Sequence, residues 1–131
     1  MSRAAVECRG VCKTFSEGEL AVQALSNVNL DIDKGDFLCL SGPSGSGKTT
    51  LLNMIGGLDV VTSGEITVAG NRLDKLTMAE LAELRLQHIG FVFQAYNLIP
   101  VLSAQENVEF VMQLQGVDAE ERRQRSGDIL Q

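Results

Sequence analysis

The chain has 131 residues, of which 44% are hydrophobic and 21% charged, as is typical of globular proteins large enough to bury a core. Its net charge of −6 and pI of about 4.7 argue against binding to the phosphate backbone of nucleic acids, which requires a basic face. The sequence has no apolar run of about 18 residues, so we expect any membrane role to come through a partner.

The three cysteines, Cys8, Cys12 and Cys39, predict free thiols. Their number is odd and no secretory signal is evident, which favours a reducing compartment. Cys8 and Cys12 have no histidine or further cysteine at the spacing of a metal site, so we do not expect bound zinc.

The first third of the chain predicts two strands. Residues 5–15 form a run typical of a strand. Residues 22–32 alternate, with Val28, Leu30 and Ile32 on one face and polar residues on the other. This period of two predicts a half-buried antiparallel strand.

A glycine-rich loop follows a third predicted strand. The apolar run 37–40 predicts a buried strand, and the helix-like run 50–55 comes after the loop. The loop matches G-x-x-x-x-G-K-[ST] at every fixed position, and the strand–loop–helix context is the one that this motif requires. The predicted phosphate-binding loop consists of Gly42, Pro43, Ser44, Gly45, Ser46, Gly47, Lys48, Thr49 and Thr50.

The residue types of this loop suit the binding of a nucleoside triphosphate. The glycines let backbone N–H groups turn toward phosphate oxygens, Lys48 supplies a charge for the β- and γ-phosphates, and the Thr49 hydroxyl can ligate Mg²⁺. The N-terminus of the following helix adds a favourable dipole. The alternative is a glycine-rich strand–helix turn that binds no ligand.

The second half of the chain predicts a mixture of helices and strands. Residues 65–69 predict a short strand, and the apolar run 89–93 predicts another buried strand. The predicted helices span about 77–87, 103–115 and 119–131, the first two opened by capping boxes.

No linker, repeat or low-complexity segment interrupts residues 1–131, so we expect a single domain or part of one. The last helix carries few apolar residues, and no carboxylate after the glycine-rich loop ends an apolar strand. P-loop NTPases usually place an aspartate there to help hold Mg²⁺. We therefore expect a domain that is truncated at its C-terminus.

Several segments together resemble the nucleotide-binding domain of ABC transporters, in particular the ATPase subunits of the lipoprotein-release, macrolide-export and cell-division group. The resemblance covers roughly residues 5–125. It implies an α/β fold of the P-loop NTPase type, with an N-terminal antiparallel β subdomain, an incomplete P-loop core and the start of a helical subdomain. The most specific part of the resemblance is residues 91–94 with 97–98, which are similar to the family's Q-loop. The segments that carry the resemblance are 11–15, 22–25, the glycine-rich loop with 51–59, 62–66, 89–100 and 106–107.

The resemblance also assigns a base pocket. Phe15 would stack on adenine, where the family usually has a tyrosine, and Val22 would line the same pocket. The loop at 42–50 would wrap the triphosphate. The alternative for Phe15 is an aromatic residue of the core or of a strand end.

The same resemblance assigns the catalytic and metal-binding side chains. Lys48 and Gln94 would be catalytic, and Thr49 and Gln94 would ligate Mg²⁺. Gln94 would also position the attacking water and report the state of the nucleotide, which suits an amide that can both donate and accept. The alternative for Gln94 is a polar residue that ends a strand.

The implied ligands are ATP and Mg²⁺, and the implied partners are a transmembrane permease subunit, near residues 95–103, and a second nucleotide-binding domain in a homodimer. The location implied is the cytoplasmic face of the inner or plasma membrane, bound through the permease. The family's signature motif, Walker B region and switch histidine would lie beyond Gln131. We therefore expect the isolated chain to bind Mg-ATP weakly or not at all, and not to hydrolyse it.

Two other classes of protein are the alternatives to this hypothesis. A P-loop nucleotide kinase would carry lid arginines, and a GTP-binding switch would carry an N-K-x-D base reader; neither pattern is present. A truncated, non-hydrolysing nucleotide-binding module is the alternative that suits the chain acting alone.

Overall fold

The computed structural model describes residues 3–131, except for the side chain of Glu17, and they divide into two compact units. The first unit ends at Arg85 and the second is Leu86–Gln131. This division does not test whether residues 1–131 form a single domain, which stays a prediction.

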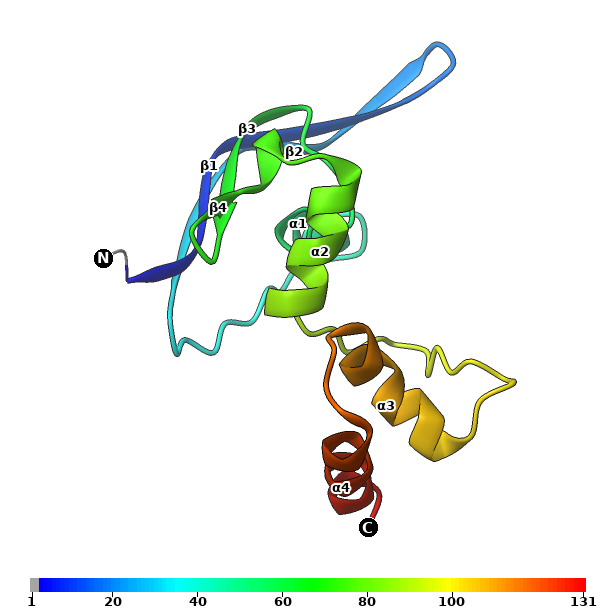
Figure 1. Cartoon of the computed structure of the whole chain (residues 1–131). Helices are drawn as coiled ribbons and strands as arrows, with labels where there is room; N and C mark the ends of the chain where they lie inside the picture. Colours follow the sequence, from blue (N-terminus) through cyan, green and yellow to red (C-terminus); the bar gives the residue numbers. More distant parts are fainter. Residues whose placement is uncertain (1–2) are drawn as a thin grey trace. The chain divides into compact units, whose positions relative to one another are not determined.

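The first unit contains a four-stranded antiparallel sheet in the order β2-β1-β3-β4 (Figure 1). β1 (Ala4–Glu17) and β2 (Leu20–Asp33) form a long hairpin, and β3 (Ser63–Val68) pairs with the other edge of β1. The short β4 (Asn71–Arg72) pairs with β3. The sheet confirms the predicted antiparallel β subdomain.

The alternation expected for residues 22–32 is present in β2. Leu25 is buried, while Val28, Leu30 and Ile32 are half-buried and the polar residues between them are exposed. Burial of each such side chain stabilises the fold by about 1.5–3 kcal/mol when complete. The core of the first unit consists of Val6, Cys8, Val11, Leu25, Ile66 and Val68 from strands, and Leu51, Met54, Leu73, Leu81 and Leu84 from helical segments.

Three helical segments belong to this part of the chain. α1 (Lys48–Ile55) begins inside the glycine-rich loop and confirms the helix expected over residues 50–55. The 3-10 helix η1 (Leu73–Lys75) precedes α2 (Met78–His88), whose start is capped by the Thr77 hydroxyl accepting from the backbone N–H of Glu80 at 3.2 Å.

Two strand predictions are wrong. Residues 37–40 and 89–93 are not strands, and within residues 3–131 neither segment makes a backbone hydrogen bond to another strand. Phe37 and Val92 are fully exposed rather than buried. The reason is physical: an apolar run becomes a buried strand only when neighbouring strands satisfy its backbone groups and cover its faces.

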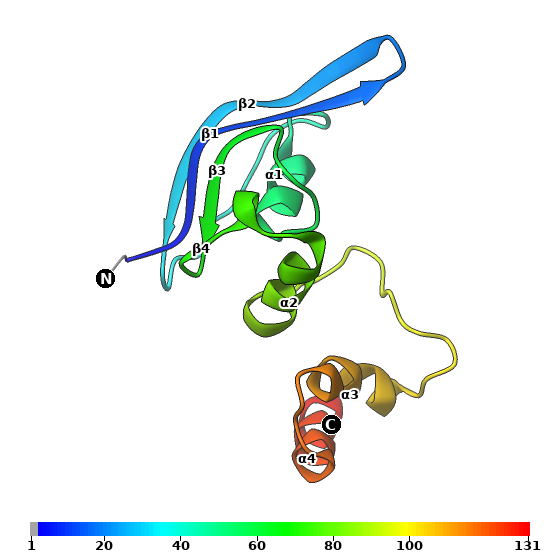
Figure 2. The same cartoon turned by 45° about the horizontal axis from the view of Figure 1, so that its top comes forward.

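The second unit holds two helices, α3 (Ala104–Leu114) and α4 (Ala119–Leu130), which lie side by side (Figure 2). α3 opens with the predicted capping box, in which Ser103 and Glu106 bond to each other's backbone N–H at 3.1 and 3.0 Å. The three cysteines, all within the described residues, are free thiols as predicted.

Candidate nucleotide-binding site

A cavity of about 510 Å³ lies where the β1–β2 hairpin meets the glycine-rich loop. The structure thus brings together Phe15, Val22 and loop residues 44–50, which the family resemblance placed in one site although they are far apart along the chain. The residues that line the cavity are Phe15, Val22, Gln23, Ala24, Ser44, Gly45, Ser46, Gly47, Lys48, Thr49 and Thr50.

The apolar end of the cavity is made by a cross-strand pair. Phe15 of β1 and Val22 of β2 are direct partners in the antiparallel register. They remain 42% and 62% exposed, so an aromatic face and a branched aliphatic side chain are available to a ligand. Apolar walls with a few placed polar groups are typical of small-molecule sites, and a flat ring suits a stacked base.

The polar end of the cavity is the N-terminus of α1. Its N-cap residue, Gly47, provides no side-chain cap, and the first turn contains no acidic residue. The first N–H groups of a helix have no partner within the helix, and the helix dipole places partial positive charge there. This uncapped end therefore fits an anionic phosphate group.

Gly47 also brings the loop into close contact with the sheet. Its φ of 91° is left-handed, and a Cβ atom at this position would lie 2.7 Å from the backbone oxygen of Ala24 in β2. Only glycine permits both the conformation and the approach. This contact joins the polar end of the cavity to the strand that carries Val22.

Lys48 crosses back over the loop. Its ammonium group donates to the backbone oxygen of Gly42, and also to that of Pro43 at 3.3 Å. Gly42 and Pro43 do not line the cavity; instead, they hold the lysine that does. The ammonium group has three N–H donors, so it can give one to a phosphate oxygen.

The two predicted magnesium ligands belong to different units. Thr49 is exposed at the rim of the cavity, whereas Gln94 lies in the second unit, where it is exposed and outside the regular elements. Within the first unit, Thr49 lines the cavity with the rest of the loop, and the role of Gln94 stays a prediction. A threonine hydroxyl beside an uncapped helix end and a lysine fits the oxygen ligation that Mg²⁺ prefers.

Sequence reasoning missed three residues of this region, Gln23, Ala24 and Lys13. Gln23 and Ala24 line the cavity next to Val22. Lys13 lies with its ammonium nitrogen 5.1 Å from the centre of the Phe15 ring. Because residues i and i+2 of a strand share a face, the spacing of Lys13 and Phe15 was a signal that could have found this contact.

The family of the chain follows from comparison with known proteins. The sequence model of the ABC transporter family matches residues 25–131. The chain belongs to the ABC transporter family. This confirms the family predicted from the sequence.

Two curated relatives show how far this ABC transporter similarity extends. The macrolide export ATP-binding/permease protein of Brucella abortus is 46% identical over 125 residues, which cover 95% of this chain and 19% of that protein. An uncharacterised ABC transporter ATP-binding protein of Methanocaldococcus jannaschii is 45% identical over 128 residues, which cover 95% of this chain and 54% of that protein. The chain thus spans about half the length of one relative and a fifth of the other.

A solved structure supports the predicted α/β P-loop fold. The dimeric post-hydrolysis state of the ATP-binding cassette MJ0796, bound to ADP and Pi, matches with a TM-score of 0.87 and 45% identity. The match covers 94% of this ABC transporter chain and 54% of the solved one. Among residues 3–131, no helix has the length and apolar character needed to cross a membrane; α4, for example, has only 12 residues.

Proposed function

We propose that this chain is the ATP-binding component of an ABC-type exporter and that its cavity binds Mg-ATP. The observation that carries the proposal is the pairing, in one cavity, of an exposed aromatic–aliphatic wall with an uncapped helix N-terminus and a lysine. The wall suits adenine and the helix end suits phosphates. The two ends of the cavity match the two ends of the nucleotide.

Each residue of the site has a distinct task in this proposal. Phe15 and Val22 bind the base, the N–H groups at the start of α1 bind phosphate oxygens, and Lys48 neutralises negative charge on them. Thr49 and Gln94 are the proposed ligands of Mg²⁺, which when bound neutralises charge on the phosphates. Gln94 is further proposed to orient the water that attacks the terminal phosphate in the assembled transporter.

The partners proposed are a transmembrane permease subunit and a second nucleotide-binding domain. The name of the Brucella relative joins ATP binding and permease in one protein, and the solved cassette is a dimer. In this arrangement the chain acts peripherally at the cytoplasmic face of the inner or plasma membrane, where ATP binding and hydrolysis drive the permease. Residues 95–103, in which Tyr96, Leu98 and Val101 are exposed, are the proposed contact with the permease.

For the chain acting alone we propose weak ATP binding, at the upper end of what the sequence led us to expect, without hydrolysis. The residues that line the cavity include no aspartate or glutamate, so the cavity offers no general base for water and no carboxylate ligand for the metal. In this state the chain is a non-hydrolysing nucleotide-binding module. This proposal concerns residues 1–131 only and is separate from the activity of an assembled transporter.

The experiment that tests the proposal is a titration of the isotope-labelled chain with Mg-ATP, followed by NMR. Amide signals of residues 42 and 44–50 should shift, and Lys48→Ala should weaken binding by about 10- to 100-fold, as expected for hydrogen bonds to charged groups. Lys75→Ala is the matched control, because Lys75 is exposed in η1, outside the cavity. Equal binding by the wild type and Lys48→Ala would refute the proposed site. Phosphate release by the pure chain that Lys48→Ala abolishes would refute the absence of hydrolysis.

A further inference from the structure

Lys13 is held against the ring that forms the apolar wall of the cavity. Its ammonium nitrogen lies 5.1 Å from the centre of the Phe15 ring, within the range of a cation–π interaction. The Lys13 side chain is only 12% exposed, whereas Phe15 is 42% exposed. A partly desolvated cation thus contacts an aromatic ring that is itself open to the cavity.

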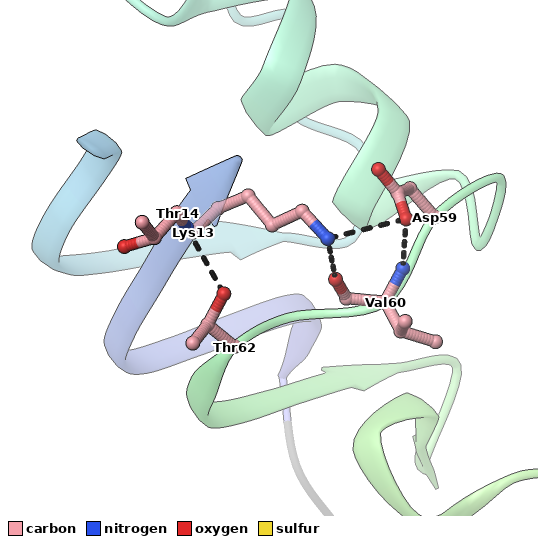
Figure 3. Close-up of polar contacts among 5 residues, drawn as sticks. All are labelled: Lys13, Thr14, Asp59, Val60 and Thr62. Atoms are coloured by element: carbon pink, nitrogen blue, oxygen red, sulfur yellow. Dashed lines mark hydrogen bonds and ion pairs between the residues drawn. The ribbon is translucent and has the colours of Figure 1, made fainter. Parts of the chain in front are cut away.

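The same ammonium group is anchored to the segment that follows α1 (Figure 3). It donates to the backbone oxygen of Val60 at 2.7 Å and pairs with the carboxylate of Asp59 at 3.3 Å. The Asp59 oxygen also accepts from the backbone N–H of Val60 at 2.8 Å, which orients the carboxylate. Two directed contacts therefore determine where the charge of Lys13 lies relative to Phe15.

A second tie joins the same strand and segment. The backbone N–H of Thr14 donates to the Thr62 hydroxyl at 2.9 Å, as Figure 3 shows, and the backbone N–H of Thr62 donates to the oxygen of Cys12 at 2.9 Å. These bonds hold β1 to the 59–62 segment without Lys13. The Lys13 ammonium group thus adds to a connection that already exists, and it differs from the other contacts in that it also touches the aromatic ring.

The Phe15 ring is open to the cavity, whereas the Lys13 ammonium group that contacts the ring lies outside the cavity lining. Phe15 lines the cavity, and Lys13 is not among the lining residues, so a ligand can meet the ring without displacing the ammonium group. A cation near a ring restrains its rotation and draws electron density from it. A restrained ring loses less side-chain freedom when a purine binds. An electron-poor ring also stacks more favourably on an electron-rich purine.

We propose that Lys13 is a positioning residue for the purine base: held by Asp59 and Val60, it restrains and polarises the Phe15 ring on which adenine stacks. The inference rests on the proposed function of the cavity. It predicts that the charge of Lys13 strengthens binding of the base but not of the phosphates, because the phosphates are bound by the loop and the helix end. A purely structural role would weaken both equally or neither.

The test compares Mg-ATP with Mg-tripolyphosphate, which has the phosphates but no base, by calorimetry and by NMR on the labelled chain. Lys13→Met keeps most of the side chain's length and removes its charge, and it should weaken ATP binding by about three- to tenfold while leaving tripolyphosphate binding unchanged. Lys13→Arg should restore ATP binding, and Lys75→Met is the matched control. If Lys13→Met does not fold, Lys13→Gln provides the same comparison.

A double-mutant cycle isolates the ring as the intermediary. In a Phe15→Leu background, Lys13→Met should have no further effect on ATP affinity, because the residue through which the lysine acts is gone. Equal losses for ATP and tripolyphosphate, or unchanged ATP binding by Lys13→Met, would overturn the inference while leaving the proposed function in place. If the wild-type chain binds neither ligand, the proposed function and this inference both fail.

Discussion

Replacing Gly47 with alanine is the sharpest perturbation that the structure offers at the glycine-rich loop. The added Cβ atom would lie 2.7 Å from the backbone oxygen of Ala24 and 3.2 Å from the Leu25 side chain. Gly45 provides a matched control, because its φ of 81° is also left-handed but a Cβ atom there would have nothing within 4 Å. The two substitutions share the conformational strain, and only one adds a collision with the sheet.

The expected loss follows from these two contributions. A left-handed conformation costs an alanine about 1–2 kcal/mol, and both variants carry this cost. The oxygen of Ala24 is closer than the ordinary carbon–oxygen contact of about 3.3 Å, so at Gly47 the backbone must also move apart, which costs about 1–3 kcal/mol. Gly47→Ala should therefore lower the free energy of unfolding by about 2–5 kcal/mol, and Gly45→Ala by about 1–2 kcal/mol.

Urea denaturation monitored by circular dichroism measures both variants under the same conditions. A loss of 2–5 kcal/mol is a large share of the about 5–15 kcal/mol that stabilises a typical domain, so the difference between the variants should be plain in their midpoints. Gly47→Ala should also weaken Mg-ATP binding, because the loop moves away from the strand that carries Val22. Equal midpoints for Gly47→Ala and Gly45→Ala would refute the close contact between the loop and β2.

Two further predictions concern side-chain contacts outside the cavity. The guanidinium of Arg72, at 2.7 Å, and the backbone N–H of Ile66 hold the pKa of Asp74 below its ordinary value. The stability that this lowered pKa contributes is present above the unfolded pKa of about 3.9 and is lost as the pH falls through the folded pKa. Asp74→Asn should therefore destabilise the fold by about 1–2 kcal/mol at pH 7 and by progressively less below pH 4, as measured by urea melts at several pH values. A difference in stability between Asp74→Asn and the wild type that does not change with pH would contradict the ion pair. Asn107 accepts from Ile99 N–H at 2.8 Å and donates to the backbone oxygens of Ile99, Leu102 and Ser103. Asn107→Ala should therefore speed hydrogen exchange of the Ile99 amide by about 10-fold or more, and unchanged protection would show that this side chain does not hold the loop.

Local patterns were enough to place most helices and the antiparallel strands. Alternation along residues 22–32 identified β2, and the capping residues Thr77 and Ser103 marked where α2 and α3 begin. These features depend on neighbours within a few positions, which the sequence displays directly. The glycine-rich loop is of the same kind, because its motif lies within nine consecutive residues.

Long-range partners could not be derived from such patterns. The apolar runs 37–40 and 89–93 predicted buried strands, but whether such a run pairs depends on other segments, and within residues 3–131 no strand pairs with either. The role of Gln94 also depends on long-range partners, since Gln94 and the glycine-rich loop lie in different units, and it stays a prediction.

The sequence by itself predicted the chemistry of the glycine-rich loop and identified the family, because both depend on residue types at short, regular spacing. The resemblance put Phe15 and Val22 in one pocket, but only the tertiary structure shows that they are cross-strand partners beside the loop. This depends on the register of the β1–β2 hairpin and on the approach of Gly47 to Ala24. It also brought Lys13 to Asp59 and Val60, which are 46 and 47 residues further along the chain. Contacts over such distances depend on how the whole sheet packs against the segments around α1, and a single sequence does not display that packing.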